Sequence, residues 1–150
     1  MDAVTYPNAE VIAFLNENFI PLRVAHDAKP LSEQFHVKWT PLLVTLDPLG
    51  GEHHRTVGFL APAELIQSLL LGLGKRWFDG DRFAEALDCF DRLLAGYPEG
   101  DGAAEAMYLQ GVSRYKQSHD PQALKETHER LEEKHPGSEW TKRAFPYRLL

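Results

Sequence analysis

Residues 41–59 read PLLVTLDPLGGEHHRTVGF, and this stretch decides the predicted architecture of the first half of the chain. Its opening run, residues 41–46, is almost continuously apolar and has the length of a strand buried on both faces. Gly50-Gly51 predicts a hairpin turn, and residues 53–59 predict a second, antiparallel strand. The sequence therefore places a β-hairpin in the middle of this half.

Two helices and one further strand are predicted on the N-terminal side of this hairpin. Asn8 is a suitable N-cap for a helix whose apolar residues follow a 3–4 spacing. Residues 19–26, FIPLRVAH, have the pattern of a strand, and residues 29–36 that of a short helix opened by Pro30. A crossover through residues 28–37 would make strands 19–26 and 41–46 parallel, which predicts a mixed sheet covered by helices.

The chain after residue 62 has the periodicity of helices only. Pro62 suits the first helical position, and Gly80-Asp81 and Gly96 to Pro98 are the expected breaks. Four helices are predicted, over residues 62–78, 82–95, 103–117 and 121–134, with a terminal amphipathic piece at 138–145. The expected fold class is thus α/β in the first part and all-α in the second.

The helical part contains an internal repeat. Gly74 and Gly111 are 37 residues apart, and Ala86 and Ala123 have the same separation. Such a period is typical of stacked helical hairpins, in which small residues allow two helices to approach closely.

Composition excludes several classes of function. The 150 residues carry 16 Lys plus Arg against 22 Asp plus Glu, a net charge of -6, and one cysteine. One cysteine cannot form an intramolecular disulfide, a CxxC pair or a four-cysteine zinc site. The acidic balance argues against a nucleic-acid partner. Neither a membrane-spanning run nor a signal peptide is visible, so we expect a cytoplasmic protein without a membrane partner.

The second half resembles the tetratricopeptide repeat family. The step Leu73-Gly74, followed by Ala86, Phe90 and Pro98, matches the spacing of that family. The second repeat retains Gly111 and Ala123 but has Thr127 at the aromatic position. The resemblance implies that the first helix of each repeat lines a surface that holds a partner peptide, with Tyr108, Arg114 and Tyr115 as candidate contacts.

The first half resembles a thioredoxin-like domain whose beginning is missing. The resemblance rests on the helix-strand-helix order, on Trp39-Thr40-Pro41 before the buried strand, on the Gly-Gly hairpin and on the closing helix from Pro62. It implies a cis peptide bond before Pro41 and a backbone strip at Thr40 and Pro41 that binds an extended peptide. The expected units are residues 1–72 and 62–150, which share the helix from residue 62.

Two functional hypotheses follow from these resemblances. The first is a non-catalytic protein-interaction or chaperone-like adaptor with no catalytic residue, metal or cofactor. The alternative is the C-terminal portion of a thiol-disulfide oxidoreductase whose CxxC motif lies upstream of Met1. Because absent strands would leave an unpaired sheet edge, we expect a homodimer or a swapped assembly.

The single thiol and the paired histidines are not expected to form a site. Cys89 lies beside Ala86 and Phe90 on the predicted buried side of a helix, so a core role is expected. His53 and His54 are neighbours on a predicted strand, where they would point to opposite faces, so together they cannot chelate one metal ion.

Overall fold

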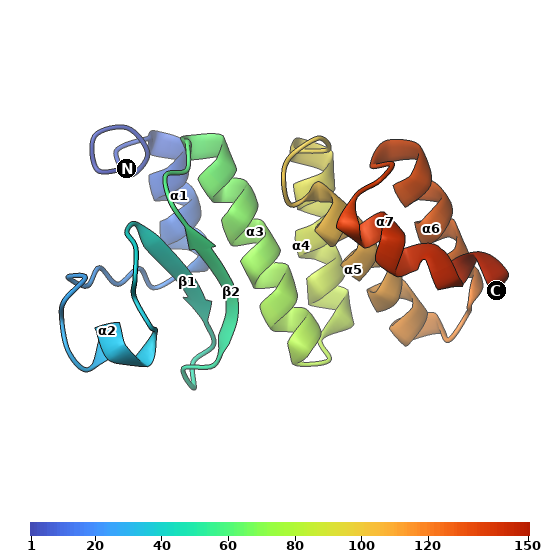
Figure 1. Cartoon of the computed structure of the whole chain (residues 1–150), viewed down its shortest axis with the longest axis horizontal. Coiled ribbons are helices and arrows are strands. Elements are labelled where there is room, and N and C mark those ends of the chain that lie inside the picture. Colours follow the sequence, from blue (N-terminus) through green and yellow to red (C-terminus); the bar gives the residue numbers. More distant parts are fainter.

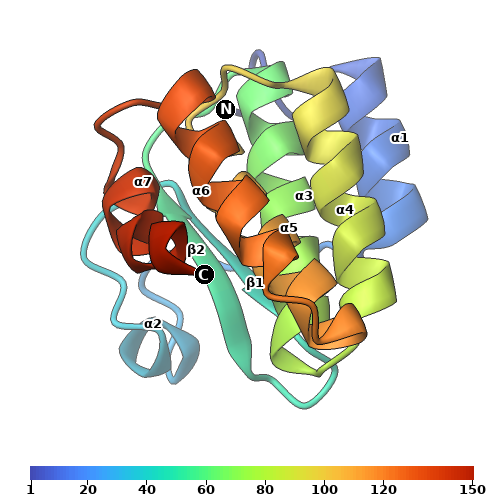
Figure 2. The same ribbon diagram turned by 90° about the vertical axis from the view of Figure 1, so that its right-hand side faces the viewer.

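The computed structural model describes all residues, 1–150, and has a small α/β part followed by a helical array. Figure 1 shows the elements in a row, from the two-stranded sheet and α2 at one end to α6 and α7 at the other, and Figure 2 shows the helices of the array side by side. No helix is both long enough and apolar enough to cross a bilayer. The predicted coarse fold class, α/β plus helical, is confirmed.

The β-hairpin forms as predicted. Strand β1 (Leu42–Leu46) pairs antiparallel with β2 (Glu52–Val57), and Leu43 lies opposite Thr56. In the turn, the Asp47 carboxylate accepts hydrogen bonds from the backbone N–H groups of Leu49 and Gly51, each at 2.8 Å. Gly50 has φ +87°, a conformation that glycine adopts without steric cost.

The predicted strand over residues 19–26 is wrong, and with it the mixed sheet. The sheet has only β1 and β2, and no parallel pair exists. Residues 20–24 have no regular secondary structure and make no backbone–backbone hydrogen bonds. Residues 20–24 pair with neither β1 nor β2, so they form no strand although their sequence favours one.

Strand β1 is also less buried than its apolar sequence predicts. Only Thr45 is fully buried, while Leu42, Leu43 and Val44 are half-buried and Leu46 is exposed. One face of the sheet packs on α3, and no layer of helices covers the whole of the other face. The prediction of a strand buried on both faces is therefore wrong.

Of the two N-terminal helices, the first lies close to its predicted position and the second is shorter than its predicted range of residues 29–36. Helix α1 (Ala9–Asn18) begins after Asn8, whose side chain accepts hydrogen bonds from the N–H groups of Glu10 and Val11, as an N-cap does. Helix α2 (Leu31–Gln34) has a single turn. The peptide bonds before Pro30 and Pro41 are both cis.

The helical array forms as the periodicity predicts. It consists of α3 (Pro62–Asp79), α4 (Phe83–Gly96), α5 (Ala103–Ser118) and α6 (Gln122–Lys134), followed by α7 (Glu139–Ala144) and the 3-10 helix η1 (Phe145–Leu149). Consecutive helices pack against each other. Helix α3 also contacts β1, β2 and α1, so the two parts of the chain share one core.

Candidate functional site

The edge of β1 that faces away from β2 has no partner. The N–H of Gly58 donates to the carbonyl of Pro41 at 2.9 Å, so Pro41 and Gly58 form a hydrogen-bonded pair across the hairpin. Because such pairs alternate along an antiparallel ladder, the backbone groups of Leu42 and Val44 point away from β2. No other part of the chain bonds to them.

Apolar side chains gather in the same region of the chain. Eight of the 13 exposed large hydrophobic residues lie between residues 20 and 59: Ile20, Leu22, Val24, Trp39, Leu46, Leu49, Val57 and Phe59. Ile20 is 98% exposed and Trp39 is 71% exposed, values that are unusual for side chains of this size. An unpaired strand edge, and exposed apolar side chains in the same part of the chain, are each typical of a surface that another polypeptide covers.

The predicted strip at Thr40 and Pro41 lies at the start of β1. Thr40 is exposed and lines a cavity of about 200 Å³ with His26, Val37, Lys38 and Trp39. The carbonyl of Pro41 is used by the hairpin bond to Gly58. Because proline also lacks an N–H, Pro41 offers no free backbone donor, and the unpaired backbone of β1 begins at Leu42.

The three residues predicted on the helical array have different neighbours. Tyr108 packs on the C-terminal segment, since its hydroxyl lies 2.8 Å from that of Tyr147 and its ring centroid lies 5.2 Å from that of Trp140. Arg114 is exposed and reaches Asp91 of α4 at 3.9 Å. Tyr115 is half-buried near His119.

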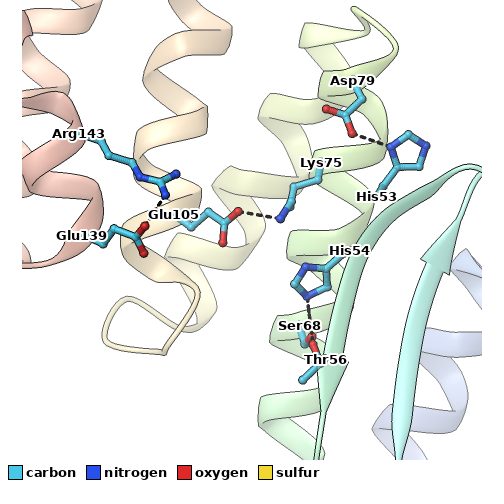
Figure 3. A network of polar contacts seen from close by, with 9 residues as sticks. All are labelled: His53, His54, Thr56, Ser68, Lys75, Asp79, Glu105, Glu139 and Arg143. Atoms are coloured by element: carbon cyan, nitrogen blue, oxygen red, sulfur yellow. Dashed lines mark hydrogen bonds and ion pairs between the residues drawn. The ribbon is translucent and has the colours of Figure 1, made fainter. Parts of the chain in front are cut away.

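A polar network joins the sheet to the helices (Figure 3). His54 Nε2 lies 3.0 Å from the hydroxyl of Ser68 on α3, and Thr56 Oγ1 lies 2.8 Å from the same hydroxyl. Burial and the nearby Lys75 ammonium lower the pKa of His54, so it is neutral near pH 7. No local sequence pattern indicates this network, because Ser68 is 12 or more residues from both of its partners.

A half-buried ion pair connects the first helices of the two hairpins. Lys75 of α3 lies 2.8 Å from Glu105 of α5 (Figure 3). The two residues are 30 positions apart, and only the packing of α3 near α5 brings them together. The pair adds a polar contact between the two helices.

His53 lies between two carboxylates. Its Nδ1 is 2.6 Å from Asp79 at the end of α3, and its Nε2 is 3.2 Å from Asp47 in the hairpin turn. Burial opposes protonation of the ring, but the hydrogen bonds and negative charges of Asp79 and Asp47 outweigh it and raise the pKa of His53. When it is protonated, the ring can donate to both carboxylates and so link the hairpin to the helical array.

His53 and His54 have no partner in common, as the alternation of side chains along a strand predicts. Asp79 and Asp47 contact different nitrogens of the His53 ring, and no group of three or more His, Cys, Asp or Glu side chains is arranged so that it could hold a metal ion. Cys89 is buried, and burial raises the pKa of its thiol to about 11. The Cys89 thiol is therefore almost entirely protonated near pH 7.

No protein-family model matches this chain, and neither a curated protein nor a solved structure matches it.

Proposed function

We propose that this chain is a non-catalytic protein-interaction module, with a thioredoxin-like scaffold continuous with tetratricopeptide-like hairpins, that binds an extended polypeptide segment at the free edge of β1. The observation that supports this most directly is the unpaired backbone of Leu42 and Val44. An added strand would satisfy these groups, a mode of recognition in which main-chain hydrogen bonds supply affinity.

The apolar side chains near this edge support the same proposal. In a strand-addition complex, alternate side chains of the added segment contact the two faces of the sheet. Leu46 is exposed on β1, and Trp39 is exposed just before it. A bound segment with apolar residues at alternate positions would cover them.

The simplest occupant of the edge in purified protein is a second copy of the chain. Two β1 strands related by a two-fold axis would pair antiparallel, with the outward groups of each Val44 facing the partner strand. This gives a homodimer, and a partner protein that binds more tightly would compete for the same edge. The helical surface near Arg114 and Tyr115 is proposed as a second contact for a protein partner.

A synthetic peptide of residues 41–47, PLLVTLD, tests the proposal. Val44→Pro removes an N–H that makes no bond within the hairpin, so the fold should persist while an added strand loses one hydrogen bond and meets the proline ring. Val44→Ala keeps the N–H and is the matched control for loss of the side chain. Labelled peptide should bind wild type and Val44→Ala, measured by fluorescence anisotropy, and not Val44→Pro. Equal binding to all three proteins would refute the proposal.

A further inference from the structure

Residues 20–24 form a second stretch of unpaired backbone in the α/β part. Their N–H and carbonyl groups make no backbone–backbone hydrogen bond, and residues 19–25 contain neither a turn nor a bend. In Figure 1 the chain between α1 and α2 passes to the side of β1 that faces away from β2. Because this segment is straight and unpaired, its backbone is free to pair with a strand placed next to it.

The segment runs in the opposite direction to β1. At its start, Asn18 lines a cavity with Trp77, near the end of α3 that contacts His53 beside the hairpin turn. At its end, His26 lines a second cavity with Thr40, which lies just before β1. One end of the segment is therefore near the end of β1, and the other is near its start.

The side chains of the two stretches are arranged alike. Phe19 and Leu43 both pack against the main core cluster. Side chains alternate along an extended chain, so the face away from this core has four exposed apolar side chains, those of Ile20, Leu22 and Val24 in the segment and of Leu46 in β1. A strand between the two stretches would lie beside apolar side chains on both of its edges.

The N-terminal turn does not pair with either stretch. A carboxylate oxygen of Asp2 lies 2.9 Å from the guanidinium of Arg23, so this turn is close to the segment. Its backbone hydrogen bonds are internal, since the N–H of Thr5 donates to the carbonyl of Met1 at 2.9 Å. The free groups of residues 20–24 and of β1 therefore both remain without a partner.

We infer, on the basis of the proposed binding at β1, that the bound segment inserts between residues 20–24 and β1 and pairs with both. It would become an inner strand of a four-stranded sheet, with β2 at one edge and residues 20–24 at the other. The partner is then an isolated extended segment with apolar residues at alternate positions. A strand that already belongs to a sheet has only one free edge and cannot use both sides.

This difference ranks the possible occupants of the β1 edge. The β1 strand of a second copy is already paired with its own β2, so it can pair on one side only. A flexible segment of another protein gains backbone hydrogen bonds on both sides. Residues 20–24 have no backbone hydrogen bond to break, so they can adjust to the spacing of about 4.8 Å between neighbouring strands. An isolated segment therefore displaces the second copy.

N-methylation of the peptide of residues 41–47 distinguishes pairing on one edge from pairing on two. In the extended peptide, the N–H groups of Leu42 and Val44 point to one edge, and those of Leu43 and Thr45 point to the other. Methyl groups on either pair block that edge only. Each doubly methylated peptide should bind at least about tenfold more weakly than the unmodified one in fluorescence anisotropy, because each loses two backbone hydrogen bonds.

The outcomes separate this inference from the proposed function. If only one of the two methylated peptides binds more weakly, the peptide pairs with β1 alone, so the insertion is refuted while the proposed function stands. If the unmodified peptide does not bind, both are refuted.

Hydrogen exchange and one pair of variants give independent readouts on the protein. Saturating unmodified peptide should slow exchange of the amide protons of residues 20–24 at least about tenfold. Ile20→Lys/Leu22→Lys should weaken the peptide about fivefold. Leu49→Lys changes an exposed leucine in the hairpin turn and should leave binding unchanged. Protection confined to β1, or equal binding to the double variant and wild type, would overturn the insertion.

Discussion

Gly74 of α3 lies directly against the ring of Phe90 on α4, so closely that a Cβ at Gly74 would be 2.3 Å from Cε1 of that ring. The contact recurs 37 residues later, where a Cβ at Gly111 would be 1.8 Å from Oγ1 of Thr127. In both hairpins the first helix has a glycine where a side chain of the second helix enters. The sequence repeat thus corresponds to a repeated close approach of two helices.

Gly74→Ala should destabilise the protein by about 2 kcal/mol, since the added methyl group displaces a fully buried aromatic ring. Gly96→Ala is the control, because a Cβ there meets nothing within 4 Å. Urea unfolding followed by circular dichroism measures both free energies of unfolding. If the two variants are equally stable, the close approach at Gly74 has no energetic importance.

The side chain of His53 predicts a dependence of stability on pH. Its folded-state pKa is raised by Asp79 and Asp47 against the effect of burial, so its contribution is fully present below the unfolded pKa of about 6.5. This contribution is lost as pH rises through the raised folded pKa. His53→Gln should therefore narrow the stability difference between slightly acidic and mildly alkaline pH, as measured by unfolding midpoints in that range.

The exposed His26→Gln variant provides the comparison for His53. It should follow the pH profile of the wild-type protein. Identical profiles for His53→Gln and wild type would mean that the two carboxylate contacts of His53 do not contribute to folding.

The folded protein should tolerate charged side chains in place of Ile20 and Leu22. They are 98% and 80% exposed, so replacing both with lysine should change the free energy of unfolding by no more than about 0.5 kcal/mol. The same change should reduce binding of a hydrophobic dye such as ANS, because two apolar side chains are removed from the surface. A large loss of stability would instead indicate that residues 20–24 pack inside the protein.

The thiol of Cys89 should react slowly with thiol reagents in the native protein. Its pKa of about 11 leaves little thiolate at pH 7.5, and its side chain is 5% exposed. Reaction with a disulfide reagent should be at least about a hundredfold slower in the native protein than in 8 M urea. Comparable rates under both conditions would contradict the buried position.

The helices and the hairpin could be predicted from sequence because their signals are local. Asn8, Pro62 and the Gly50-Gly51 turn determine where elements begin or reverse, and the apolar spacing after residue 62 identifies the helices. The burial of Cys89 followed from its helical face. These features depend on residues that are close together in the chain.

Local sequence could not predict that residues 19–26 form no strand. Its apolar sequence favours a strand, but a strand forms only when it pairs with another one. The pattern gives no information on whether this segment pairs with β1, and the edge of β1 away from β2 has no partner. The positions of His53 between Asp47 and Asp79, and of Lys75 beside Glu105, also depend on packing between distant segments. No spacing rule within a single element identifies them.

The free edge of β1 is expected to bind another strand, and sedimentation equilibrium over a wide range of protein concentration tests this most directly. Wild type and Val44→Ala should show a concentration-dependent monomer–dimer equilibrium, and Val44→Pro should remain monomeric with an unaltered circular dichroism spectrum. A wild-type protein that stays monomeric throughout the range, or a Val44→Pro variant that dimerises as strongly as wild type, would contradict strand addition at this edge.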